Sequence, residues 1–252
     1  MPTHPLLEIC VESAERAAAA ERGGADRIEL CSDLSSGGVT PNPTLMRAAR
    51  RSVRVPIHVL IRPRLGDFVY SNSDFAAMKG DIQVAKEAGM DGIVLGLLDK
   101  TREVDRERTS VLIKLAHPLP VTFHRAFDRC RDLTAALQAV IETGAIRILT
   151  SGGKARGTDG ISTLADLVAK AGDRIVIMPG GSIRASNVQH ILRGTGAREI
   201  HSSLATSRDS GKPEIHGAVR RGVGDGSAEF EARVRKVRRL IEALSSDASC
   251  SN

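Results

Sequence analysis

Acidic, imidazole and thiol side chains recur at alternate positions of several short apolar segments. Glu8 and Cys10 alternate in LEICV, and Glu29 and Cys31 alternate in IELC. Basic residues fall at such positions in later segments: His58 and Arg62 in HVLIR, His124 in VTFHR, and His201 in EIHS. Alternate residues of a strand share one face, so each segment presents these polar groups to a single side. Carboxylates and imidazoles that meet there can exchange protons with a substrate, and arginine can bind an anion.

The segments that carry these residues alternate with helical patterns. Short β-branched runs begin at residues 6, 27, 56, 91, 120, 147, 174 and 198. Their spacing of about 20 to 35 residues is the size of one βα unit. Between them, segments such as 12–26 and 132–146 have apolar residues three and four apart and glycine near their ends. Eight such units predict an α/β fold, a single (β/α)8 TIM-type barrel. A doubly wound open sheet is the alternative, but no GxGxxG follows the first run.

The strand faces opposite the polar residues are apolar, with Leu7, Ile9, Ile28 and Leu30 as examples. A surface between barrel strands and outer helices must be apolar, so the polar residues must face the barrel interior. Chemistry in such barrels lies at the C-terminal ends of the strands. Because a buried unpaired charge costs many kcal/mol, the polar groups either neutralise one another as a structural network or bind a ligand.

One interpretation is an enzyme that acts on a small polar or anionic molecule, which could be phosphorylated or sugar-like. Glu8, Glu29 and His124 would transfer protons, and Arg62 would stabilise charge. Further residues would bind the substrate: Arg64, Arg125 and His201. No nucleophile elbow, Walker loop or HExxH motif is present to define the reaction, and we expect no organic cofactor.

Two glycine pairs follow predicted strands at the same end of the barrel. Gly152 and Gly153 lie in TSGG, and Gly180 and Gly181 lie in PGGSIR, where we expect a helix to begin near Ser182. Glycines let the backbone approach an anion closely, and a helix N-terminus adds partial positive charge. The pairs therefore predict anion binding, with ordinary tight turns as the alternative.

The charge distribution and composition limit the partners of the chain. The net charge is +6, and five positive side chains cluster within residues 233–239, a run typical of a solvated helix face. With five Phe, one Tyr and no Trp, the chain offers no aromatic platform for nucleic acid. It shows no secretory leader pattern and no apolar run of about 20 residues, so we expect a cytoplasmic protein without a membrane partner.

The expected organisation is one domain with a tail. The barrel body would cover residues 1–211, and a basic helical segment over 212–245 would complete the same domain. We expect a disordered tail over 246–252. The formation of a homo-oligomer is left open.

Several longer motifs resemble, in order, those of the CutC family of copper-homeostasis proteins. They include LEICVES, GGADRIELCSDLSSGGVTP, VLIRPRLGDFVYS, PVTFHRAFD, RILTSGG and IMPGGSIR, within residues 6–210. The resemblance implies a cytoplasmic TIM-type barrel with a copper ion, or a small-molecule ligand, as its partner. Ser182 departs from the pattern, since the family more often has a further glycine there.

Cys10 and Cys31 correspond to the cysteine pair of the family, and the resemblance thereby implies a Cu(I) site. Cu(I) favours thiolate ligands, and neighbouring strands lie about 4.8 Å apart, which would let two sulfurs share one ion. Two buried cysteines that merely fill space are the alternative. A second alternative to the Cu(I) site is a hard divalent ion held by Glu8, Glu29 and histidines.

Overall fold

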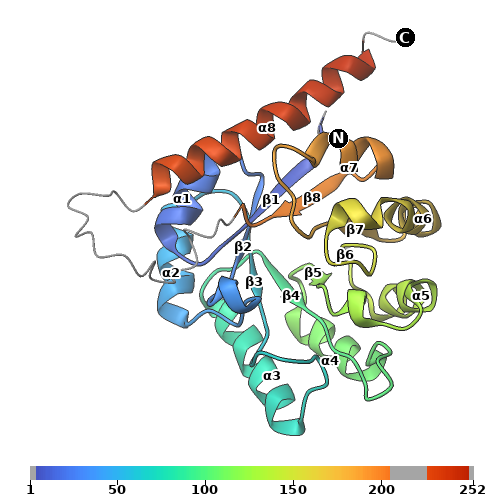
Figure 1. The fold of residues 1–252 in the computed structure, drawn as a ribbon. Coiled ribbons are helices and arrows are strands. Elements are labelled where there is room, and N and C mark those ends of the chain that lie inside the picture. The colour runs from blue at the N-terminus through green and yellow to red at the C-terminus, as the bar shows by residue number, and fades with distance from the viewer. Residues whose placement is uncertain (1–3, 205–225, 250–252) are drawn as a thin grey trace, which may run out of the picture.

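The computed structural model describes residues 4–204 and 226–249, which form a (β/α)8 barrel (Figure 1). The parallel strands are β1 Leu6–Val11, β2 Arg27–Leu30, β3 Ile57–Leu60, β4 Gly92–Leu95, β5 Val121–Phe123, β6 Arg147–Thr150, β7 Val176–Pro179 and β8 Glu199–Ser202. Hydrogen bonds join them in the order β7-β6-β5-β4-β3-β2-β1-β8, which nearly closes the barrel. The predicted fold class is confirmed.

The helices lie outside the strands. They are α1 Ala14–Arg22, α2 Pro43–Ser52, α3 Asn72–Glu87, α4 Arg106–Ala116, α5 Leu133–Thr143, α6 Ile161–Ala171, α7 Val188–Thr195 and α8 Ser227–Ser249. Short 3-10 segments cover Leu34–Ser36, Phe127–Arg129 and Gly157–Gly160. Five helices begin after a side chain that accepts a first-turn backbone N–H: Ser13, Asn42, Ser71, Asp105 and Asp132. No helix in the described ranges is long and apolar enough to cross a membrane.

The helix expected near Ser182 begins instead at Val188, so that prediction was wrong. Ser182 has a left-handed backbone with φ 57°, which a right-handed helix cannot include. The Asn187 side chain then holds the loop, because it accepts from Arg184 N at 2.8 Å and donates to Ser182 O at 2.9 Å. Helical geometry starts only after these contacts.

The apolar strand faces form the core between barrel and helices, as expected. Leu7, Ile9 and Ile28 are fully buried there. The final helix, α8, joins the same core through Phe230 and Val234 and packs along α1 (Figure 1). It extends to Ser249, past the expected limit of the helical segment at residue 245. The expected segment from 212 to 225 and the last three residues of the expected tail lie outside the described residues.

The basic run on α8 is not a uniformly solvated face. Arg238 is buried, forms an ion pair with Asp26 and donates to Gly24 O at 2.7 Å. Arg235 instead pairs with Glu231 on the helix surface. Part of this positive charge therefore fastens α8 to the barrel.

The strand register determines which side chains meet inside the barrel. In the β1–β2 ladder, Cys10 lies opposite Glu29, and Glu8 lies opposite Arg27. In the β1–β8 ladder, Glu8 also lies opposite His201. The interior is therefore layered, with Glu8 two residues closer to the N-terminal end of β1 than Cys10.

Candidate functional site

The layer of the interior nearest the N-terminal ends of the strands is a buried ion-pair network. Arg27 pairs with Glu8 and, at 2.5 Å, with Glu199. Arg147 contacts the same Glu199 carboxylate at 2.5 and 2.9 Å and donates to Thr122 Oγ1 at 3.2 Å. Two arginines thus face two carboxylates, which meets the need of buried charges for partners.

Both arginines of this network were missed by the sequence analysis, although a signal existed for Arg27. This residue has the same parity as Glu29 in β2 and as Cys31 directly after this strand, so strand alternation places it in the interior. Arg147 is the first residue of β6. An arginine at the end of a strand usually extends its charged group into solvent, so the sequence offered no reason to place Arg147 in the interior.

Glu8, a predicted catalytic residue, has both carboxylate oxygens engaged. Arg27 binds Oε2, and His201 Nδ1 lies 2.7 Å from Oε1. Burial alone would raise the pKa of Glu8, but Arg27 and His201 hold that pKa well below its usual value. Glu8 therefore remains ionised and positions His201, and it does not line the cavity described below.

The two predicted metal-binding cysteines meet above this network. Cys10 Sγ lies 3.5 Å from Cys31 Sγ and 3.3 Å from Glu29 Oε1. Cys31 Sγ also lies 3.7 Å from Val11 O. The hydrogen bond with Cys31, burial and the charge of Glu29 together raise the pKa of Cys10 well above its usual value. Cys10 is thus a thiol at neutral pH, and a bound cation would have to displace its proton.

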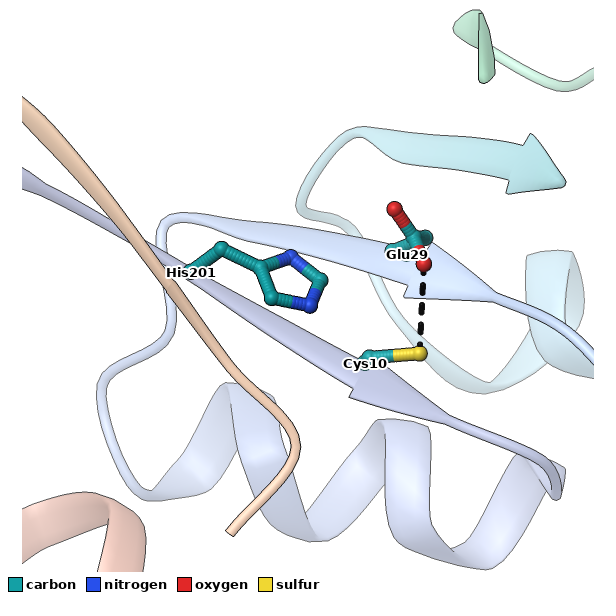
Figure 2. Close-up of side chains that lie close together, drawn as sticks. All are labelled: Cys10, Glu29 and His201. Carbon is teal, nitrogen blue, oxygen red and sulfur yellow. Dashed lines mark hydrogen bonds between the residues drawn. The ribbon is translucent and has the colours of Figure 1, made fainter. Parts of the chain in front are cut away.

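Glu29 and His201 complete a cluster around Cys10 (Figure 2). Cys10 and Glu29 come from the adjacent strands β1 and β2, and His201 comes from β8. One ligand atom from each of the three residues lies within 4.8 Å of the others. Burial raises the pKa of Glu29, and its Oε2 has no hydrogen-bond partner in the described structure. Burial would lower the pKa of His201, but Glu29 and Glu8 raise it.

This donor set fits a soft metal ion. A metal–thiolate bond is about 2.3 Å long in zinc sites, so one ion can reach two sulfurs that lie 3.5 Å apart. Cu(I) prefers such sulfur ligands, whereas hard divalent ions prefer several oxygens. Glu8 cannot supply these oxygens without leaving Arg27 and His201. The arrangement therefore favours thiolate coordination over the hard-ion alternative.

Two further histidines, His58 and His124, pack in the interior against glycines. Gly92 lies in β4 and faces His58, and Gly96 directly follows β4 and faces His124. A Cβ at Gly92 would lie 2.4 Å from the His58 ring, and a Cβ at Gly96 would lie 2.4 Å from the His124 ring. Burial lowers the pKa of His58 to about 4 and that of His124 to about 3, the latter with the help of Arg62. Both imidazoles are therefore neutral at pH 7.

The hydrogen bond at His124 fixes its tautomer. Ala126 N donates to His124 Nδ1 at 3.2 Å, so the ring proton lies on Nε2. His124 Nε2 is buried without a partner in the described structure, and so is His58 Nδ1. A buried polar atom without a partner is costly, and the Nε2–H of His124 is a donor available to a ligand.

A cavity of about 210 Å³ opens at this end of the barrel. It is lined by predicted site residues from six strands or the loops after them: Cys10, Glu29, Arg62, His124, Arg125, Gly181 and His201. The other predicted site residues do not line it: Glu8, Cys31, Arg64, Gly152, Gly153 and Gly180. Pockets for drug-sized ligands have volumes of about 300–1,000 Å³, so this cavity suits an ion or a small polar molecule.

The first glycine pair binds a carboxylate of the protein itself. Asp128 Oδ1 accepts from Ser151 N and from Gly153 N, each at 3.0 Å. Gly152 N donates to Thr150 Oγ1 at 3.0 Å. The backbone donors of this turn therefore hold Asp128, which in turn pairs with Arg125 at 2.8 Å.

The second glycine pair is shaped by close packing. Gly180 N donates to Thr150 O at 2.8 Å, and a Cβ on Gly180 would lie 2.6 Å from Leu149 Cδ1. Gly181 has φ 88°, a conformation that favours glycine. Gly181 and Ser182 both line the cavity.

The predicted substrate-binding residue Arg64 lies outside the cavity, since its guanidinium binds Asp67 and Asp74.

The fold and the site define a (β/α)8 barrel with a thiol, carboxylate and imidazole cluster at the C-terminal ends of its strands. The CutC family profile matches residues 5–206, and the chain belongs to the CutC family. A copper homeostasis protein cutC homolog from Homo sapiens is 45% identical over 235 residues, which cover 93% of this chain and 86% of that protein. The Mus musculus homolog of the same name is 44% identical, over 96% of this chain and 90% of its own length.

A solved structure shares both the family and the fold. A CutC copper homeostasis protein from Streptococcus agalactiae superposes with a TM-score of 0.76 at 32% sequence identity. The match covers 79% of this chain and 98% of that chain. Sequence and structure comparisons thus agree on the family that the motifs indicated.

Proposed function

We propose that the protein binds Cu(I) through Cys10 and Cys31 and thereby acts in cytoplasmic copper homeostasis. The observation that carries the proposal is the 3.5 Å separation of the two buried Sγ atoms. A cytoplasmic location goes with it, because thiols remain reduced in that compartment. The names of the relatives support the same role.

The surroundings of the thiols would supply the rest of the site. Glu29 Oε1 lies next to Cys10 Sγ and can accept the thiol proton when a cation binds. Glu29 and His201 are also close enough to Cys10 to act as further ligands. Arg27 and Glu8 hold His201 in place from below.

The test is a competition titration of the reduced protein against a chromogenic Cu(I) chelator without oxygen. We expect about one Cu(I) per chain, and a loss of at least about tenfold in affinity for the Cys10→Ser/Cys31→Ser double variant. Cys130→Ser is the matched control, because Cys130 lies outside the cavity on the C-terminal side of Phe127–Arg129. Unchanged affinity in the double variant would refute the proposal.

An acid–base enzyme is the second candidate function. The observation in its favour is that Glu29 Oε2 and His124 Nε2, both buried and without partners in the described residues, belong to residues that line one cavity. Glu29, with its raised pKa, could donate a proton and His124 could hold a polar atom of the substrate. Arg62 and Arg125 could bind a negative group.

A thermal-shift screen of small phosphorylated and sugar-like compounds separates the two functions. The enzyme function predicts a stabilising compound whose effect is lost in Glu29→Gln and His124→Asn but kept in the double cysteine variant. A screen without any stabilising compound would count against the enzyme.

A further inference from the structure

The cavity around Cys10 shares part of its wall with a larger basin at the barrel mouth. This outer basin has a volume of about 900 Å³. The two cavities share Gly37, Arg62, Phe68 and Arg125 in their walls. Cys10 is only 2% exposed, and Cys31 is fully buried. A metal ion that enters from the C-terminal end of the barrel would reach Cys10 through this basin.

Cationic side chains outnumber carboxylates in the lining of the outer basin. Its cationic residues are Arg62, Arg102, Arg125, Arg129 and Lys154. Its two carboxylates are already paired, Asp128 with Arg125 and Asp67 with Arg64. Within residues 4–204 and 226–249, no ion pair is formed by Arg62, Arg129 or Lys154. The basin therefore carries uncompensated positive charge in the described structure.

Arg62 is one of two cations that line both cavities, and unlike Arg125 it forms no ion pair within the described residues. Its side chain is buried, with Nη1 donating to Gly37 O and Gly38 O at 3.1 and 3.0 Å and Nη2 donating to Gly66 O at 2.9 Å. Its Nε is buried and has no partner in the described residues. Carbonyl groups satisfy hydrogen bonds but do not neutralise the charge, so a buried cation remains for an anion to pair with.

These charges oppose the passage of a bare cation toward Cys10. In a narrow cleft with low-dielectric walls, side chains of one sign attract ions of the opposite sign and repel their own. An ion bound by two thiolates of a carrier, by contrast, forms a complex with negative charge, to which carboxylates of the carrier add more. Such a complex matches the basin in charge, and the basin is large enough for a ligand of that size.

We propose that the outer basin binds an anionic thiolate complex of Cu(I), with carboxylates on the carrier, and that copper passes from this complex to Cys10 and Cys31. This inference rests on the proposed Cu(I) site. In the exchange, each Cu–S bond to the carrier breaks as a Cu–S bond to a cysteine forms. Each cysteine proton moves to the carrier thiolate that is released. Copper remains Cu(I), so no oxidant or reductant is needed.

The test compares two carriers of opposite charge by stopped-flow transfer of Cu(I) to the reduced protein. Mercaptosuccinate carries two carboxylates, and cysteamine carries an ammonium group. The variant is Arg129→Gln/Lys154→Gln, whose side chains are exposed and can change without loss of the fold. Arg51→Gln is the matched control, because Arg51 is an exposed cation on α2 that does not line either cavity.

We expect the double variant to accept copper from mercaptosuccinate at least about tenfold more slowly than wild type and Arg51→Gln at low salt. Transfer from cysteamine should not slow, and added salt should shrink the difference because it screens the charges. Equal rates for the double variant and wild type with mercaptosuccinate would overturn the proposal.

A second measurement separates this proposal from the Cu(I) site itself. Calorimetric titration of metal-free mercaptosuccinate into Cys10→Ser/Cys31→Ser protein reports the basin without copper. Binding that weakens on Arg129→Gln/Lys154→Gln supports the basin even if the cysteines bind no copper. Absence of binding in this titration contradicts the basin, whatever the copper affinity of the wild type.

Discussion

Glu8 and Glu29 are buried carboxylates of neighbouring strands whose pKa values are shifted in opposite directions. Glu8 has Arg27 and His201 as partners, which outweigh burial and lower its pKa. The Cys10 thiol donates a hydrogen bond to Glu29, and burial raises the pKa of Glu29. One carboxylate therefore belongs to the structural network, whereas the other is held at the cavity at a cost in stability.

This contrast predicts different effects of the same substitution. Glu8→Gln removes one of the two carboxylates that neutralise buried Arg27. Because part of a buried charge is then uncompensated, we expect the free energy of unfolding to fall by about 3 to 5 kcal/mol. Glu29→Gln removes a carboxylate that has no cationic partner within hydrogen-bond distance among residues 4–204 and 226–249, and we expect a change of less than about 2 kcal/mol. Urea denaturation at pH 7 measures both. Equal losses in the two variants would show that Glu29 is part of the architecture as well.

The buried imidazole of His124 predicts a pH dependence of stability. Its pKa falls from 6.5 to about 3 on folding, so the unfolded chain binds more protons between these values. The contribution of His124 is therefore fully present above about pH 6.5 and is lost as the pH falls toward 3. We expect His124→Asn to flatten the fall in stability between pH 6 and 4 by up to about 1.4 kcal/mol per pH unit.

Urea denaturation at several pH values checks this slope. Parallel curves for wild type and His124→Asn would show that the imidazole is not neutralised by burial. At pH 7 we expect the variant to differ from wild type by less than about 2 kcal/mol, because Nε2 has no partner to lose in the described residues.

The contact between Gly96 and His124 predicts a steric effect on the cavity. A Cβ at position 96 would lie 2.4 Å from the imidazole, so Gly96→Ala must displace the ring or the strand. We expect a loss of about 1 to 3 kcal/mol in stability. Gly80→Ala is the control, because Gly80 lies within α3 with open space at its Cβ, and we expect it to gain about 0.5 to 1 kcal/mol. Thermal unfolding measures both, and a neutral Gly96→Ala would contradict the packing described here.

Strand alternation predicted several of the side chains that enter the barrel, although Arg27 and Arg147 were missed. Glu8, Glu29 and His201 all face the interior because the side-chain period of a strand is fixed at two residues. The partners of these groups could not be predicted in the same way. Arg27 reaches Glu199 only because β2 and β8 flank β1 in the sheet, which depends on the register of three strands.

The loops were less predictable than the strands. Asp128 takes the backbone donors of Ser151 and Gly153, a contact between the segments after β5 and β6 that no local pattern encodes. Ser182 adopts a left-handed conformation that is uncommon for a residue other than glycine, and this delays the start of α7. Local propensity therefore predicted the elements, and tertiary contacts determined which donors remain available for a ligand.

X-ray absorption at the copper edge of the loaded, reduced protein tests the central claim most directly. The 3.5 Å separation of Cys10 Sγ and Cys31 Sγ predicts copper in the Cu(I) state with two sulfur ligands. The same spectrum should persist in Cys130→Ser and lose its sulfur contribution in Cys10→Ser/Cys31→Ser. A first shell of nitrogen and oxygen alone in the wild-type protein would contradict the account.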